Sequence, residues 1–315
     1  KTESFLLPIF SSLIEESKTW EGGSPVGANW WEGQDAEWSP QRAGETGRLP
    51  AVRTLIMYPM NALVEDQLVR LRKATDSEAA RTWFKDNRNG HRFFFGRYTG
   101  RSPVAGSSGD KYKVSDLREQ HKVNARRSNL IAGDDRRYYL PRLDGAEMRS
   151  RWDMQSHPPD ILITNYSMLN IMLMRQLERP ILDKTRLWLE QSPDHIFQIV
   201  VDELHMYRGT SGTEVAYLLR RLLHHLGLTP DSPQVRFIAT SASLPEGEGS
   251  KTFLSEFFGA SPESFDIHEG TVVSSNAGPE NSLKEFADSF KSWGQQPQSP
   301  EEAVHLLEAS NAGEV

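Results

Sequence analysis

Short apolar runs alternate with amphipathic stretches along most of the chain. Five runs are short enough to be buried strands, at residues 54–58, 92–95, 161–164, 198–201 and 235–240. Helical periodicity follows several of them, at residues 62–73, 168–178 and 212–226. Strands that alternate with helices predict an α/β fold, a doubly wound parallel sheet with helices on both faces. In such a sheet the active site lies at the carboxyl ends of the strands.

Two segments break this pattern, and we expect both to be insertions into the core. Residues 19–50 are rich in Gly, Pro and Trp, and residues 101–157 are polar with several pairs of arginines. The tryptophans predict a small hydrophobic plug or a surface for a protein partner, with stacking on bases as the alternative. The arginine pairs leave two interpretations open, a surface that faces DNA or a solvated basic loop.

The charge is distributed unevenly. The net charge is -7, but residues 245–315 hold 13 acidic and 3 basic residues, so the rest of the chain is mildly basic. A mildly basic core permits nucleic-acid binding without requiring it. We therefore expect a core domain over residues 1–245, followed by an acidic extension over 246–315. That extension is either a linker or the start of a following domain, with short helices near 251–258 and 301–309.

The composition excludes several classes of site. The chain has no cysteine, which excludes disulfides, thiolate metal sites and a cysteine nucleophile, and its nine histidines lack zinc-ligand spacing. The mean hydropathy is -0.57, and no apolar run is long enough to span a bilayer. We expect a protein of the cytoplasm that makes no membrane contact. The chain begins at Lys1 without an initiator Met or a leader, as a fragment or a processed chain would.

Two adjacent carboxylates follow the apolar run at 198–201. Nucleotide hydrolysis on an α/β sheet needs one carboxylate for Mg²⁺ and a second to position or deprotonate the attacking water. Asp202 suits the first role and Glu203 the second, while His205 is placed to contact a neighbouring motif or the γ-phosphate side. The alternative is a strand that simply ends in an acidic turn.

The first two residues have the form of the end of a phosphate-binding loop, Gly-x-x-x-x-Gly-Lys-Ser/Thr. Lys1 would contact the β- and γ-phosphates, and the Thr2 hydroxyl would be a Mg²⁺ ligand. The apolar stretch that follows has the pattern of the helix behind such a loop. By itself a terminal Lys-Thr has no significance, so this interpretation depends on the motifs downstream.

Polar or small residues also follow three other predicted strands. Backbone N–H groups and small side chains at such positions suit phosphate contacts that do not depend on sequence. The candidate nucleic-acid-binding residues are Pro59, Asn61, Thr99, Gly100, Thr164 and Asn165. Helix capping and turn formation are the alternatives for each of them.

The fifth predicted strand ends in a run of hydroxyl residues, from Thr240 to Ser243. These hydroxyls are placed to bond the cluster of Asp202 and His205 and to couple hydrolysis to movement. We single out Ser241 and Ser243 for this role. The alternative is an ordinary Ser/Thr-rich turn.

Taken together, these motifs resemble superfamily 2 helicases in order and spacing. Lys1-Thr2 resembles the end of motif I, residues 59–67 motif Ia, and residues 98–100 motif Ib. Residues 164–165 resemble the motif before the acidic box, residues 202–205 a DExH box, and residues 241–243 motif III. The resemblance covers residues 1–245 apart from the insertions, and it implies a RecA-like first motor domain. Ser243 departs from the threonine usual in motif III but keeps the hydroxyl.

The resemblance implies ATP and Mg²⁺ as cofactors, an ATP hydrolase as the enzyme, and nucleic acid as a partner, with DNA expected. It also implies a second motor domain in the same chain, because such motors bind ATP between two domains. This part alone is then expected to be inactive. More narrowly, the sequence is similar to large bacterial helicases of DNA-repair and phage-defence loci, including that of the DISARM system. The alternative is a motor-like module that binds nucleic acid or a partner without hydrolysis.

Overall fold

A computed structural model of the chain describes residues 2–24, 29–33, 37–59, 62–131, 133–244 and 247–270. The chain divides into two compact units, Lys1–Ile267 and His268–Val315. The helix expected near 301–309 lies outside the described residues. The account below concerns the first unit, which contains the sheet.

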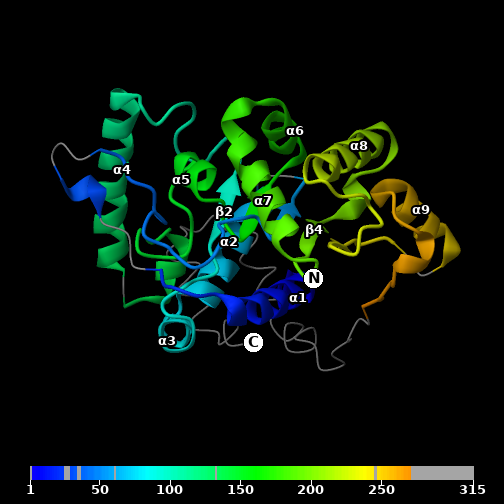
Figure 1. Cartoon of the computed structure of the whole chain (residues 1–315), viewed down its shortest axis with the longest axis horizontal. Coiled ribbons are helices and arrows are strands. Elements are labelled where there is room, and N and C mark those ends of the chain that lie inside the picture. The colour runs from blue at the N-terminus through cyan, green and yellow to red at the C-terminus, as the bar shows by residue number, and fades with distance from the viewer. Residues whose placement is uncertain are drawn as a thin grey trace, which may run out of the picture. The chain divides into compact units, whose positions relative to one another are not determined.

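Five strands form one sheet in which every neighbouring pair is parallel (Figure 1). The strands are β1 (Thr54–Met57), β2 (Phe95–Tyr98), β3 (Ile161–Thr164), β4 (Phe197–Val201) and β5 (Val235–Ala239). Their order is β2-β3-β1-β4-β5. Met57 pairs with Thr164 on one side and with Val201 on the other, so the carboxyl ends of the three central strands are level. The parallel α/β sheet predicted from the sequence is confirmed.

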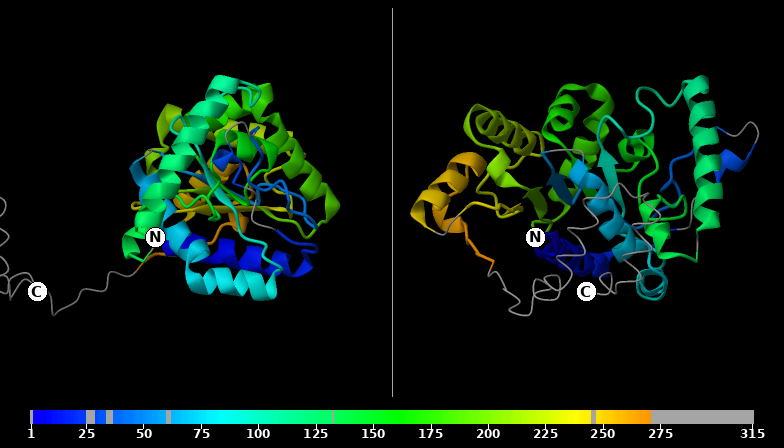
Figure 2. Two further views of the ribbon diagram at one scale, coloured as in Figure 1. Left: turned by 90° about the vertical axis from the view of Figure 1, so that its left-hand side faces the viewer. Right: turned by 180° about the vertical axis from the view of Figure 1, so that it is seen from behind.

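Helices cover both faces of this sheet, as the sequence predicts (Figures 1 and 2). One face packs against α1 (Thr2–Glu16), α2 (Ala62–Asp76) and α3 (Glu78–Asn87). The other packs against α6 (Tyr166–Met174), α7 (Arg179–Gln191), α8 (Gly209–His225) and α9 (Glu248–Phe258). Successive side chains of β1 serve opposite faces, since Leu55 belongs to the second core and Ile56 to the first. Burial on both faces explains why the strands have continuous apolar runs.

The remaining elements lie in the two segments expected as insertions and in short connections. They are α4 (Lys111–Leu130) and α5 (Arg151–Ser156), which lie toward the β2 edge of the sheet in Figure 1. Single 3₁₀ turns complete the list: η1 (Ser17–Thr19), η2 (Trp30–Glu32), η3 (Asp135–Tyr139), η4 (Gln176–Glu178), η5 (Leu204–Met206) and η6 (Pro262–Ser264).

The second strand begins three residues later than the sequence predicts. The apolar run at 92–95 stops just before Gly96, but Gly96 lies inside β2. A Cβ on Gly96 would stand 2.5 Å from the Met154 sulfur and 3.1 Å from the Met148 Cβ. The glycine therefore marks a close approach between elements, which is the usual reason for glycine inside a strand.

Two of the four tryptophans of the first segment are buried against the second segment. Trp30 and Trp31 are 6% and 2% exposed and form one hydrophobic cluster with Leu117 of α4 and Trp152 of α5. This is the hydrophobic plug expected from the sequence, and it leaves these two rings no free face for stacking on bases. The arginine pairs also divide, because Arg126 and Arg127 are exposed on α4 whereas Arg149 and Arg151 are buried.

A buried ion network attaches the first segment to the sheet. Glu45 pairs with both Arg42 and Arg48, and Arg48 also bonds Asp160 just before β3 at 2.9 Å. The Arg48 guanidinium lies 3.7 Å from the centre of the Trp20 ring. Burial would raise the pKa of Glu45, but the charges of Arg48 and Arg42 outweigh it and hold that pKa far below its usual range.

The first unit extends beyond the boundary expected at residue 245. Helix α9 packs on α8, and Phe258 of α9 stacks on Phe237 of β5 with 4.6 Å between ring centres. The acidic character of this stretch lies on the exposed side of a helix whose other side is apolar, so charge alone misplaced the boundary. The unit ends at Ile267.

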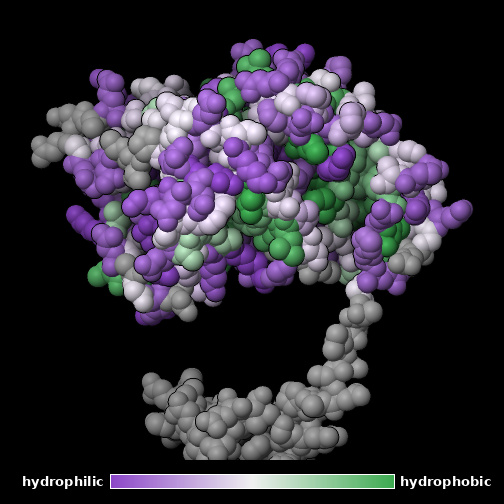
Figure 3. Space-filling model, turned by 60° about the horizontal axis from the view of Figure 1, so that its bottom comes forward, coloured by the Kyte–Doolittle hydropathy of each residue, from purple (hydrophilic) through white to green (hydrophobic). Residues whose placement is uncertain are grey.

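Among the described residues, β5 is an edge strand that pairs only with β4. A groove of about 830 Å³ lies beside it, lined by Pro8, Ser11 and Glu15 of α1 and by Phe237 and Ile238 of β5. Figure 3 brings the α1 side of the sheet forward and shows hydrophobic surface gathered in a hollow of this face.

Candidate active site

The two adjacent carboxylates lie in a tight turn at the carboxyl end of β4. Asp202 is 6% exposed, and its backbone N–H donates to Met57 O of the neighbouring strand at 3.0 Å. Glu203 follows in the left-handed region, with φ 51° and ψ 49°. For a residue other than glycine this conformation costs about 1–3 kcal/mol and is found most often at functional sites. The turn therefore holds strain that directs Asp202 and Glu203 to different surroundings.

Thr240, directly after β5, joins the two strand ends. Its hydroxyl donates to the Asp202 carboxylate and accepts from the Glu203 N–H at 3.3 Å. Its carbonyl accepts from the Leu204 N–H at 2.7 Å. The hydroxyl run was expected to bond the acidic cluster, but Ser241 and Ser243 were singled out instead. Thr240 makes the bond because it directly continues β5, whose neighbour in the sheet is β4.

Ser241 and Ser243 form the next part of the same turn. The Ser241 hydroxyl accepts from the Ser243 N–H at 3.2 Å. Arg208 donates to the Ser243 hydroxyl and to its carbonyl, both at 3.2 Å. Neither serine has a bond to Asp202 among the described contacts. Their bonds connect the β5 turn to the start of α8 instead.

His205 links the two turns from the other side. Its Nδ1 lies 3.2 Å from the Glu203 carboxylate and 3.5 Å from the backbone nitrogen of Ala242. The side chains of His205 and Glu203 are 28% and 24% exposed, so both can be reached from solvent. The acidic turn (Asp202–Glu203) and the hydroxyl turn (Thr240–Ser243) thus touch through the half-buried Thr240 and through His205 at the surface.

Two tyrosines that were not among the expected site residues lie beside Asp202. Tyr58 and Tyr207 are 0% and 6% exposed, and their hydroxyls have no hydrogen-bond partner among the described residues. Burial, and then the charge of Asp202, raise the pKa of both phenols well above the usual range. Both therefore stay neutral and can donate a hydrogen bond. The sequence pattern did not single them out, because Tyr58 ends the apolar run of the first predicted strand and Tyr207 has the pattern of a core aromatic.

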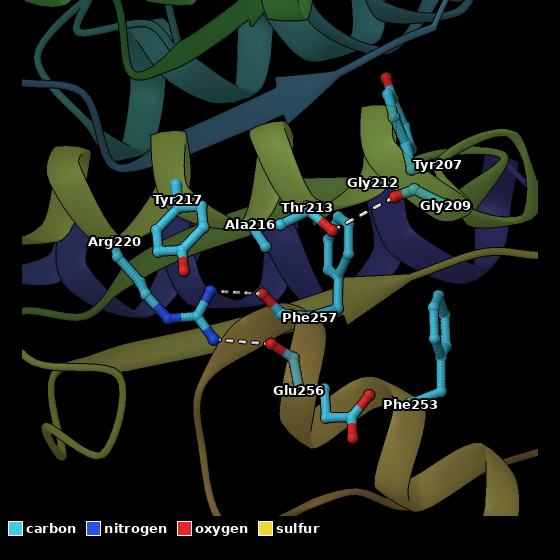
Figure 4. Close-up of a pocket in the computed structure, with 10 residues that line it drawn as sticks. All are labelled: Tyr207, Gly209, Gly212, Thr213, Ala216, Tyr217, Arg220, Phe253, Glu256 and Phe257. Carbon is cyan, nitrogen blue, oxygen red and sulfur yellow. Dashed lines mark hydrogen bonds between the residues drawn. The ribbon is translucent and has the colours of Figure 1, made fainter.

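Tyr207 also borders a pocket between α8 and α9 of about 480 Å³ (Figure 4). In that view its hydroxyl points away from the other lining residues. Arg220 closes the opposite side by donating to the Glu256 and Phe257 carbonyls at 2.6 and 3.1 Å. The pocket therefore adjoins the acidic turn through one residue.

Part of the expected phosphate-binding edge lies outside the described residues. This holds for Lys1, for Asn61 and for the side chain of Thr2, which is the first residue of α1. Pro59 is half-buried in the bend after β1. Asp202, Glu203, His205 and the hydroxyl turn are thus the expected residues that the structure brings together.

The loops after β2 and β3 use their hydroxyls internally. Thr99 is 0% exposed, and its hydroxyl accepts from the Arg101 N–H at 3.3 Å. Thr164 is equally buried and donates to Tyr98 O at 2.8 Å. Asn165 caps α6 by accepting from the Met168 N–H at 2.9 Å. These three side chains are thus engaged in hydrogen bonds within the fold, whereas Gly100 is exposed.

Within the described part of the chain, no group of three or more His, Asp or Glu side chains is placed to hold a metal ion by itself. A single buried carboxylate with a hydroxyl beside it suits Mg²⁺ bound together with nucleotide phosphates, which Mg²⁺ prefers to an all-protein cage. No helix among those residues is both long and apolar enough to cross a membrane.

Comparisons with known proteins agree with the helicase character of these motifs. The chain is 33% identical to Druantia protein DruE of Escherichia coli (strain UMEA 4076-1) over 365 aligned positions, which cover 98% of this chain and 18% of that protein. It is 27% identical over 99 residues to an uncharacterized ATP-dependent helicase, MJ1574 of Methanocaldococcus jannaschii (strain ATCC 43067 / DSM 2661 / JAL-1 / JCM 10045 / NBRC 100440), across 31% of this chain and 13% of that protein. No family model matches the sequence.

Solved structures of the DUF1998 helicase MrfA are similar at low identity. With MrfA bound to DNA and AMPPNP the TM-score is 0.36 and the identity 20%, over 67% of this chain and 20% of that one. For another MrfA structure the TM-score is 0.37 and the identity 18%, over 82% of this chain and 31% of that one. The chain spans less than a fifth of the length of each curated relative it matches. Sequence similarity to DruE and to a protein named an ATP-dependent helicase makes this chain helicase-like.

Proposed function

We propose that the protein is an ATP-dependent helicase or translocase that acts on nucleic acid, with DNA as the expected substrate, in DNA repair or defence against phage. This chain would be its first, RecA-like motor domain, with a DExH-type acidic turn. The observation that carries the proposal is the junction of Asp202, Glu203 and Thr240, where two neighbouring strands end. Similarity to DruE and to a protein named an ATP-dependent helicase supports the same class.

The residues of the acidic turn have distinct roles in this proposal. Asp202, buried and fixed by Thr240, would hold Mg²⁺ together with the Thr2 hydroxyl. Glu203, partly exposed, would orient the attacking water and accept its proton. Lys1 would bind the β- and γ-phosphates. When bound with ATP, Mg²⁺ neutralises the charge that phosphoryl transfer develops.

Coupling between hydrolysis and movement would use the bonds between the two turns. His205 contacts Glu203 and the backbone of the hydroxyl turn after β5. A shift of the Glu203 carboxylate during hydrolysis would therefore move that turn. Ser241 and Ser243 lie in the same turn, and Arg208 connects Ser243 to the start of α8. Nucleic acid would then contact the loops on this edge, where Gly100 and the backbone at the start of α6 are accessible.

The decisive test is ATP hydrolysis by the full-length protein carrying Glu203→Gln. Loss of a general base lowers turnover by about 100- to 10,000-fold, and glutamine keeps the size of the side chain. Glu119→Gln, on the exposed face of α4, is the matched control and should leave turnover unchanged. If hydrolysis stimulated by nucleic acid survives Glu203→Gln, the role of Glu203 is wrong.

A second measurement separates this function from a motor-like module that binds without hydrolysis. A hydrolysing motor binds nucleic acid in the Glu203→Gln form and no longer turns over ATP. A module of the second kind shows no nucleic-acid-stimulated hydrolysis in the wild-type protein either. Wild-type turnover measured with single-stranded DNA and with RNA also identifies the preferred nucleic acid.

A further inference from the structure

A second polar cavity lies away from the acidic turn, between α4 and the chain that leads into α5. Its volume is about 80 Å³, which leaves room for several water-sized groups. It is lined by side chains from β2, from α4 and from residues 141–149. The charged and titratable members are Arg97, His121, Arg142, Glu147 and Arg149.

Arg149 is a buried cation without a direct ion-pair partner, although the charges of Asp153 and Asp144 act on it from a longer distance. It is 8% exposed, and no carboxylate lies within ion-pair distance of it among the described residues. Its Nε donates to Leu143 O at 2.7 Å, its Nη2 donates to the same oxygen, and its guanidinium lies over the Trp31 ring at 4.4 Å. Burial lowers its pKa to about 10. A guanidinium carries five N–H groups, so Arg149 keeps donors for another acceptor.

Three of the other buried arginines in the described part of the chain are paired with a carboxylate, whereas Arg151, also buried, donates to Thr99 O and has no ion pair. Arg42 has Glu45, Arg53 has Glu16, and Arg72 has Glu147 as a partner. Buried charges are expected to be paired, because the desolvation cost is otherwise too large. Of the two described buried arginines without an ion pair, Arg149 is the one that lines the cavity.

His121 in the same lining is also without a partner. It is 2% exposed, and neither ring nitrogen has a hydrogen-bond partner among the described residues. Trp30 and Trp31 flank the ring, with centres 5.7 and 5.2 Å away. Burial and the charge of Arg149 lower the pKa of His121 to about 3, so the ring is neutral and offers one N–H. An orphaned buried donor next to a cavity calls for a bound group.

The other charges at the cavity are already used. Glu147 accepts from Arg72 at 2.6 Å, Arg142 bonds Asp144 at 2.9 Å, and Arg97 pairs with Glu65. Arg97 and Arg142 nevertheless contribute positive potential, because both are mostly buried. Three arginines and one carboxylate line the cavity, and among these arginines Arg149 alone has no carboxylate within ion-pair distance in the described part of the chain.

We propose that this cavity binds a phosphate-class oxyanion between Arg149 and His121. Such an anion supplies a direct ion-pair partner for Arg149 and an acceptor for the unpartnered His121 N–H. A tetrahedral oxyanion has several acceptor atoms and a size that the cavity admits. Inorganic phosphate and a phosphate group of nucleic acid share this chemistry, so the experiment has one arm for each source.

The test is calorimetric titration of inorganic phosphate into the full-length protein without nucleotide. All titrations use the Lys1→Ala background, which removes the phosphate contact expected at the nucleotide site. Arg149→Met should weaken binding by at least about 10-fold, since a charge-assisted hydrogen bond contributes about 1.5 kcal/mol or more. Arg136→Gln, exposed and remote from the cavity lining, is the matched control and should bind like the background protein.

Two further variants keep the proposal falsifiable if Arg149→Met does not fold. Arg142→Gln, at a partly exposed side chain, should weaken phosphate several-fold. His121→Phe keeps an aromatic ring between the tryptophans and should also weaken phosphate binding. It should also lower the number of protons taken up on binding, which is measured by comparing titrations in two buffers of different ionisation heat. Absence of phosphate binding, or binding that none of the three lining substitutions changes, would overturn the proposal.

The source of the anion follows from competition. A 5′-phosphorylated oligonucleotide that displaces phosphate, where the unphosphorylated one does not, identifies a terminal phosphate of nucleic acid. Displacement by both identifies a backbone phosphate, and displacement by neither identifies the free anion. All three results support the oxyanion site, and none depends on ATP hydrolysis, so this proposal and the proposed function fail separately.

Discussion

Replacing Thr240 with valine would remove one hydroxyl from the junction of β4 and β5 and would keep the shape of the side chain. That hydroxyl donates to the Asp202 carboxylate and accepts from the Glu203 N–H. A hydrogen bond to a charged group contributes about 1.5–3 kcal/mol and a neutral one about 0.5–1.5 kcal/mol. Thr240 is half-buried, so water replaces part of both bonds. We therefore expect Thr240→Val to lower the free energy of unfolding by about 2 kcal/mol.

Urea unfolding followed by circular dichroism measures this change. Thr240→Ser is the matched control, because serine keeps the hydroxyl and loses only a methyl group, which costs about 1 kcal/mol or less at a half-buried site. A Thr240→Val protein as stable as the wild type would refute the bond to Asp202. Equal losses in the valine and serine variants would assign the effect to packing.

Three further predictions concern stability. Gly96→Ala should destabilise the protein by about 1–3 kcal/mol through overpacking, whereas Gly100→Ala, which meets open space, should be nearly neutral in the same urea titration. Glu45→Gln should cost about 3–5 kcal/mol because it leaves two buried arginines without their shared partner. The pKa of Glu45 is depressed in the folded protein, so its contribution to the free energy of unfolding is full above about pH 4.3 and declines as the pH falls below that value. The difference in unfolding free energy between wild type and Glu45→Gln should therefore narrow only in acid. Trp31→Ala should cost about 3–5 kcal/mol in thermal unfolding, and Tyr112→Ala, at an exposed aromatic, should cost under about 0.5 kcal/mol; similar losses in both would mean that the plug is not a core.

The sheet could be predicted from the sequence because parallel strands buried on both faces have continuous apolar runs. The run at 161–164 became β3 with the same bounds. The error at β2 has a physical cause, since a glycine that ends a strand and a glycine that admits a methionine look alike without the third dimension. Strand order was beyond prediction, because it depends on which helices cross to which face.

The candidate site was predictable in its residue types and less so in its bonds. The adjacent carboxylates after β4 are visible as an acidic pair at the end of an apolar run. Thr240 reaches Asp202, and Ser241 and Ser243 do not, because of the register between β4 and β5. This register cannot be read from the sequence. The unpartnered hydroxyls of Tyr58 and Tyr207 have no signal at all in a pattern of apolar positions.

The edge position of β5 has a practical consequence for handling the chain. Its outer N–H and C=O groups face no strand within the described part of the fold, and the groove beside it is partly apolar. An open strand edge is a template on which an extended segment of another molecule can add. We expect samples of this chain to self-associate as concentration rises, and a lysine in place of Ala239, an exposed residue of β5, should delay that association.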